Sequence, residues 1–167
     1  MSEQRGGVAG SVERLSPGEG TPFWFVTDLY TAKLVSEDTD GAFTLFEVTA
    51  APQSPQLPHM HHREDEIYYV LEGQFEFVDD GRTFTAGAGS MVYLAKDRFH
   101  SHRNPGDLPA KALVFFRPAG IEKFIAEAGK PAERPFALPP PPDEADIARL
   151  LAVAPRHGFE APPSSPA

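Results

Sequence analysis

Five of the six histidines in this 167-residue chain fall into two short clusters. The first cluster reads HMHH over residues 59–62, and the second reads HSH over residues 100–102. His59 and His61 are two residues apart, so on an extended strand both imidazoles point to the same side. Imidazole nitrogens are common ligands of divalent transition metals, so this spacing predicts a metal site.

A carboxylate after the first cluster completes a coherent ligand set. Glu66 does not share the strand parity of the two histidines, so residues 62–65 must form a bend that brings its side chain round. Tyr68 and Val70 then share the face of Glu66 and would line the interior. A histidine on a later strand supplies the fourth ligand if the chain folds into a barrel. The predicted metal ligands are His59, His61, Glu66 and His100.

Three imidazoles and one carboxylate suit one divalent ion per chain, which could be Fe, Ni, Co, Mn, Cu or Zn. Four protein ligands leave a five- or six-coordinate ion one or two open positions for water, O2 or a substrate oxygen, whereas structural sites tend to be closed. The chain has no cysteine, which excludes thiolate ligands, disulfides and cysteine nucleophiles. The alternative is a polar cluster at the mouth of a barrel that holds no metal.

Short aromatic and β-branched runs between residues 21 and 118 predict the elements that position these ligands. The runs are FWFVTDLYTAKLV, AFTLFEVTA, EIYYVLE, QFEFV, RTFT, SMVYLA and KALVFF. Turn signals such as SEDTDG separate them, and no helical pattern interrupts them. About seven short strands of this kind indicate an all-β sandwich or barrel. Phe115 and Phe116 are adjacent, so only one can point inward, and we choose Phe116 as a substrate-binding candidate.

The ends of the chain have a different character. Residues 1–20 are rich in Gly, Ser and Glu and predict a flexible lead-in. Residues 119–167 predict a helical, proline-rich strap that wraps the barrel or touches a second subunit. GIEKFIAEAG has apolar residues at helical spacing and ends in Gly129, and DEADIARLLAVA carries a second apolar stripe at Ile147, Leu150, Leu151 and Ala154. We interpret this second helix as packing or a dimer contact rather than as part of the site.

The charge of the chain limits its partners. The formal net charge is −9, which disfavours phosphate backbones and anionic lipid. We found no apolar run long enough to span a bilayer and no apolar core of a signal peptide at the start. We therefore expect a cytoplasmic protein, a homodimer with a small-molecule substrate and no nucleic-acid or membrane partner.

The two histidine clusters lie in longer patterns that resemble the two motifs of the cupin superfamily. PHMHHREDEIYYVLEG is similar to the first motif, with Glu66 and then Gly73 at the expected distances. GSMVYLAKDRFHSHRN is similar to the second, with Gly89, His100 and Asn104. The resemblance covers roughly residues 21–127 and implies a single cupin barrel, a double-stranded β-helix or jelly roll, with C-terminal helices.

Three positions depart from the cupin pattern. Gln53 replaces the glycine that usually opens the first motif, and Ala95 and Asp97 replace the usual proline and glycine of the second. These positions shape turns, so the departures affect the expected geometry of the loops and do not change the predicted metal ligands.

HHREDEIYYVLEG, together with the downstream PAGIEKF, resembles the monocupin branch that includes bacterial quercetin dioxygenases. The resemblance implies an O2-dependent dioxygenase that acts on a flavonol or a related phenolic enol. It also implies that Glu66 accepts the hydroxyl proton of the substrate. Two alternatives remain: a non-oxidative metal Lewis-acid enzyme of secondary metabolism, that is, an isomerase, cyclase or decarboxylase, or a metal-dependent small-molecule binding protein.

Several polar residues near the ligands have two interpretations. His102 shares strand parity with His100 and is a candidate catalytic acid or base, although such a neighbour more often orients a ligand or lies at the surface. The role of His62 is open in the same way. Glu64 and Asp65 are expected to solvate the bend rather than to transfer protons. Tyr68 is a further substrate-binding candidate, whereas Gly73 and Asn104 are expected to be structural.

Overall fold

The computed structural model describes residues 14–134 and 136–162, so most of the expected lead-in over residues 1–20 lies outside the described residues. The elements follow the chain as β1 (Thr21–Phe25), β2 (Asp28–Leu34), β3 (Thr44–Ala50), β4 (Met60–His61), β5 (Asp65–Glu72), β6 (Gln74–Asp79), β7 (Arg82–Gly87), β8 (Met91–Leu94), β9 (His100–Arg103), β10 (Ala110–Arg117), α1 (Ile121–Ala128), β11 (Lys130–Pro131), α2 (Glu144–Val153), the 3-10 turn η1 (Ala154–His157) and β12 (Phe159–Glu160).

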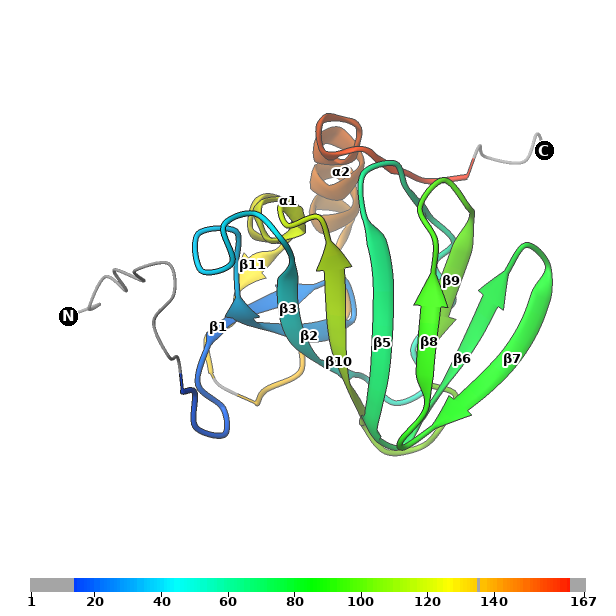
Figure 1. Ribbon diagram of the computed structural model, residues 1–167. Helices are drawn as coiled ribbons and strands as arrows, with labels where there is room; N and C mark the ends of the chain where they lie inside the picture. Colours follow the sequence, from blue (N-terminus) through cyan, green and yellow to red (C-terminus); the bar gives the residue numbers. More distant parts are fainter. Residues whose placement is uncertain (1–13, 135, 163–167) are drawn as a thin grey trace.

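The largest sheet has the strand order β11-β1-β2-β3-β10-β5-β8. Every second residue of β3 and β10 is buried, which is the pattern of strands that cover a core with one face. The central strand β10 pairs antiparallel with β3 and β5, so that Phe116 lies between Thr44 and Glu66. Figure 1 shows this sheet curving around the interior of the barrel.

A second sheet, ordered β7-β6-β9, forms the opposite wall. A tight turn at Gly73, with a φ of 70°, connects β5 to β6. Asp80 and Gly81 both have positive φ and form the two-residue hairpin turn between β6 and β7. An isolated bridge between His59 and His100 continues this wall toward the short β4–β12 pair.

Alternate side chains of the two walls fill the interior. The largest fully buried side chains in the barrel include Tyr68, Phe46, Phe75, Phe77, Val48, Val70 and Val114. Phe46 packs edge to face on Phe116, with the ring centroids 6.2 Å apart. The predicted all-β jelly-roll barrel with C-terminal helices is confirmed.

The tail returns along the barrel. The helix α1 buries Ile121, Phe124, Ile125 and Ala128 and ends at Gly129, as the helical spacing predicts. Asp143 caps α2 through a reciprocal bond with Asp146. Both helices lie at one end of the barrel, at the top of Figure 1.

Two features of the strands differ from the sequence prediction. The run FWFVTDLYTAKLV forms two strands, because Val26 has a φ of 56° and turns the chain back on itself. The tail adds β11 at the edge of β1 and β12 at the edge of β4, which its composition did not indicate. Within the described ranges, no helix combines the length and the apolar character that a bilayer crossing needs.

Candidate metal centre and cavity

Three imidazoles and one carboxylate converge inside the barrel. The cluster consists of His59, His61, Glu66 and His100, all buried, and one ligand atom from each lies within 4.8 Å of the others. The Glu66 Oε2 atom is 3.0 Å from His100 Nε2 and 3.6 Å from His61 Nε2. These N and O atoms surround one point and fit a single divalent transition-metal ion.

The local backbone explains this convergence. The bridge between His59 and His100 holds the first cluster against β9, with backbone N–H to O distances of 2.9 Å in both directions. Residues 62–64 leave the strand conformation, and β5 then begins at Asp65. The predicted bend therefore brings Glu66 back to the two histidines.

The protonation of His59 suits a metal. His59 Nδ1 lies 2.8 Å from the Leu57 carbonyl, which can only accept, so Nδ1 carries the proton and Nε2 keeps its lone pair. Burial and the neighbouring imidazoles hold the pKa of His59 well below its ordinary value, so the ring is neutral. Burial alone would raise the pKa of Glu66, but the bond from His100 and the other imidazoles lower it below the ordinary value, so Glu66 is ionised.

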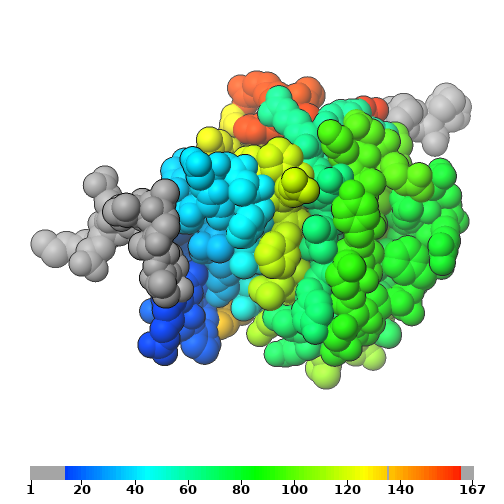
Figure 2. Space-filling view, viewed as in Figure 1, coloured from blue at the N-terminus to red at the C-terminus, as the bar shows by residue number. Residues whose placement is uncertain are grey.

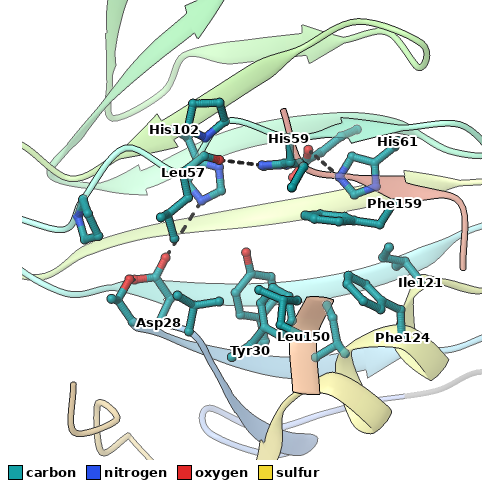
Figure 3. Close-up of a pocket in the computed structure, with 18 of the residues that line it drawn as sticks. Asp28, Tyr30, Leu57, His59, His61, His102, Ile121, Phe124, Leu150 and Phe159 are labelled. Carbon is teal, nitrogen blue, oxygen red and sulfur yellow. Dashed lines mark hydrogen bonds and ion pairs between the residues drawn. The ribbon is translucent and has the colours of Figure 1, made fainter. Parts of the chain in front are cut away.

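The cluster lies at one end of a cavity of about 360 Å³. In Figure 3, His59, His61 and His102 lie on one side of this cavity, and Tyr30, Phe124 and Leu150 lie on the opposite side. The lining is mostly apolar, and it includes Phe116. Of the two adjacent phenylalanines, Phe116 therefore points inward, as chosen from the sequence.

A second polar pair lines the cavity beside the ligand cluster. His102 Nε2 lies 3.9 Å from Asp28 Oδ2, and His102 Nδ1 lies 3.0 Å from the Tyr68 hydroxyl. Burial alone would lower the pKa of His102, but the carboxylates of Asp28 and Glu66 raise it. Tyr68 stands behind His102, outside the residues that line the cavity, so its substrate-binding role stays a prediction.

Asp28 was missed in the sequence. It lies at the start of β2 and shares a strand face with Tyr30, which also lines the cavity. The shared strand face with Tyr30 was the one feature of the sequence that could have indicated Asp28, because the residue does not belong to a metal-binding or catalytic motif.

The tail forms much of the apolar wall, so α2 lines the cavity in addition to the packing that the sequence predicted. Leu150 and Leu151 of α2 line the cavity together with Phe124 of α1. Phe159 of β12 stacks on His59, with ring centroids 4.9 Å apart and planes 13° apart. Helical spacing predicted the apolar stripe correctly but could not show what it faces.

The residues around the bend divide into two groups. His62 faces outward, where its two ring nitrogens contact Asp97 at 2.8 Å and Glu160 at 2.7 Å. Asp65 accepts a bond from the Lys96 backbone N–H. Glu64, in contrast, is 4% exposed, so the expectation that it solvates the bend was wrong.

The departures from the cupin pattern preserve the turns. Gln53 and Asp97 both have positive φ, 52° and 61°, so each adopts the left-handed backbone that a glycine would favour. Asn104 is buried and bonds to Leu108 O and Gly106 N, which fixes its loop as expected.

The comparisons with known proteins agree with this architecture. A family model described as Cupin domain matches residues 46–116. An uncharacterized protein of Methanocaldococcus jannaschii is 33% identical over 70 residues, which cover 42% of this chain and 56% of that protein. The polyketide synthase CurC of Streptomyces cyaneus is 35% identical over 60 residues, which cover 36% of this chain and 39% of that protein. The matches thus span less than two thirds of either relative.

The crystal structure of a predicted oxalate decarboxylase from Thermotoga maritima has a TM-score of 0.58 and 24% identity, and the match covers 64% of this chain and 99% of that one. This similarity concerns the fold alone. The quercetin dioxygenase branch stays a prediction. Residues 46–116 thus match a family model described as Cupin domain, and the chain has a jelly-roll barrel with a buried three-histidine, one-glutamate cluster that could hold one metal ion.

Proposed function

We propose that the protein is a metal-dependent dioxygenase that uses O2 to cleave a flavonol or a related phenolic enol. The observation that supports this most is the cavity, whose aromatic and aliphatic wall leads to the ligand cluster. Its volume of about 360 Å³ lies within the ordinary range for small-molecule sites, roughly 300–1,000 Å³. A flavonol has a planar apolar body and an acidic hydroxyl group. The body would lie against the apolar wall of the cavity, and the hydroxyl group would lie at the ligand cluster, which is the polar end.

The polar end would bind and deprotonate the substrate hydroxyl. A divalent ion held by the four ligands would supply Lewis acidity that stabilises the resulting enolate. Glu66 is ionised and lies at the cluster, so its free carboxylate oxygen can accept the hydroxyl proton. His102, held by Asp28 and Tyr68, is the second candidate acid or base.

The apolar end would orient the substrate and exclude water. Phe124, Phe159 and Phe116 come from three different elements and all line the cavity. Aromatic side chains of this kind favour offset or edge contacts with a planar ligand. A dry cavity also protects a reactive carbanion from protonation by water.

An oxygen electrode tests the proposal. Protein loaded in turn with Fe, Ni, Co, Mn, Cu or Zn is mixed with flavonols, with and without O2. We expect O2 uptake with at least one redox-active metal, its loss in His100→Ala, and its retention in His62→Ala, a matched control whose ring faces outward. No O2 uptake with any metal and flavonol would contradict the dioxygenase.

A non-oxidative Lewis-acid enzyme is the second candidate. The buried Asp28–His102 pair in the cavity wall favours it, because a carboxylate–imidazole pair can transfer protons in an isomerisation or cyclisation without O2. The similarity to a polyketide synthase also fits an enzyme of secondary metabolism. Substrate conversion by the zinc form under anaerobic conditions would support this candidate over the dioxygenase.

A further inference from the structure

A second carboxyl group lies buried beside the ligand cluster. Glu64 follows the bend after β4 and is 4% exposed. Its Oε2 atom lies 3.8 Å from His61 Nδ1. Among the described residues, both of these buried atoms lack a hydrogen-bond partner.

A buried polar atom that makes no hydrogen bond is costly, because its bond to water is lost and not replaced. Glu66 lies on the other side of the same imidazole, with Oε2 3.6 Å from His61 Nε2. Two carboxyl groups therefore flank His61, Glu66 at Nε2 and Glu64 at Nδ1.

The two nitrogens of His61 then have different tasks. If Nε2 gives its lone pair to a cation, the ring proton must sit on Nδ1, where it needs an acceptor. The distance of 3.8 Å to Glu64 is about 1 Å longer than a charge-assisted N–H···O bond, so a small ring rotation closes it. His59 already has such an acceptor in the Leu57 carbonyl, at 2.8 Å.

We propose that Glu64 is a positioning residue that accepts the Nδ1 proton of His61 when a divalent cation occupies the cluster. Glu64 is absent from the group of atoms that converge on the ion position, so it acts through His61 rather than as a ligand. A carboxylate acceptor fixes the ring and makes the opposite nitrogen a stronger donor than a carbonyl does. The inference rests on metal binding at the cluster, and not on the oxygenase reaction.

Metal affinity provides the first test. Co²⁺ or Zn²⁺ binding is measured by competition with a chromophoric chelator for the wild type, Glu64→Gln and the matched control Asp65→Asn. We expect Glu64→Gln to weaken binding about 10–100-fold, as for other residues that orient metal ligands, and Asp65→Asn to leave it nearly unchanged. Equal affinity in wild type and Glu64→Gln would overturn the proposal.

Nuclear magnetic resonance of the wild type provides a test that no folding defect can obscure. In the Zn²⁺-loaded protein, we expect a protected Nδ1–H proton on His61, shifted downfield by its bond to a carboxylate. A His61 ring with the proton on Nε2 would overturn the inference. Neither measurement involves substrate or O2, so failure here leaves the dioxygenase untouched, whereas a wild type that binds no metal would contradict both.

Discussion

At the scale of single residues, Glu122 shows how one buried carboxylate anchors an element of the cavity wall. Its side chain accepts bonds from the Ser36 backbone N–H and hydroxyl, from the Thr44 hydroxyl at 2.5 Å and from the Gly120 backbone N–H at 3.0 Å. Burial alone would raise the pKa of Glu122, but these donors hold it below its ordinary value. The carboxylate thus fixes the start of α1 to the β2–β3 connection and β3.

Because the pKa of Glu122 is lower in the folded state than in the unfolded state, its contribution to stability is present above the ordinary glutamate pKa and disappears as the pH falls below it. We expect Glu122→Gln to lower the free energy of unfolding by about 1–3 kcal/mol at pH 7, and by less at pH 3.5. Urea denaturation at both pH values measures this. The control is the exposed Glu133→Gln, and an equal loss at both pH values would contradict the prediction.

Residue spacing predicted the ligand cluster but not the groups behind it. The alternation of a strand and the need for a bend placed His59, His61 and Glu66 correctly. Glu64 and Asp28 carry no such mark, because their burial depends on the path of the bend and on the strand that lies opposite. The sequence near a site therefore predicts the ligands themselves more readily than it predicts the residues that contact and orient those ligands.

At the scale of elements, the two-residue strand β12 makes several contacts with the ligand cluster. It pairs with β4, which carries His61, and its Phe159 contacts the rings of His59 and Phe124, both with centroids 4.9 Å away. The outward His62 bonds to Glu160 of the same strand. The strand therefore covers the ligand cluster on the side of the tail.

Removing the Phe159 ring should uncover the metal centre. We expect Phe159→Ala to lower the free energy of unfolding by about 1–3 kcal/mol, less than the roughly 3–5 kcal/mol for a fully buried phenylalanine, because Phe159 is only partly buried. We also expect a chelator to remove bound metal faster, as measured by stopped flow. The exposed Leu108→Ala serves as control, and an unchanged removal rate would show that access lies elsewhere.

The elements of the barrel could be predicted from the sequence because each strand has its own alternation and turn. The position of the tail could not. Helical spacing in α2 identifies an apolar stripe, but that stripe could equally have covered the outer sheet face or a second subunit. Only the three-dimensional path shows that Leu150 and Leu151 face the cavity.

At the scale of the whole molecule, the candidate ligands come from two segments, residues 59–66 and His100, and Glu66 and His100 are 34 residues apart, so a bound ion would cross-link the fold. A ligand at 100 times its dissociation constant stabilises the folded state by about 2.7 kcal/mol, which corresponds to a Tm change of about 5–11 °C for a chain of this size. We expect chelation to lower the Tm by this amount in differential scanning fluorimetry. An unchanged Tm would indicate an accessible site on an already rigid barrel.

Exposed apolar side chains gather on the outer face of the barrel. Four exposed apolar side chains lie there on neighbouring strands, Tyr69 and Leu71 on β5 and Met91 and Tyr93 on the edge strand β8. Figure 2 shows the face over β10, β5 and β8, drawn in yellow-green and green. An exposed apolar patch of this kind favours a second copy of this chain as its partner.

We therefore expect a homodimer in light scattering after gel filtration, and a monomer for the double variant Met91→Glu and Tyr93→Glu, because four like charges would meet in the interface. Leu108→Glu, which adds a charge at an exposed loop, should remain dimeric. A monomeric wild type would contradict this arrangement.

The cavity wall is built from three parts of the chain. The candidate ligands lie within residues 46–116, the part that matches the family model, whereas Asp28 and Tyr30 precede that part and α1, α2 and β12 follow it. A change in the tail could therefore alter which molecule the cavity accepts and leave the candidate ligands in place. Chimeras that exchange residues 119–162 between related barrels would show whether the tail determines the substrate preference.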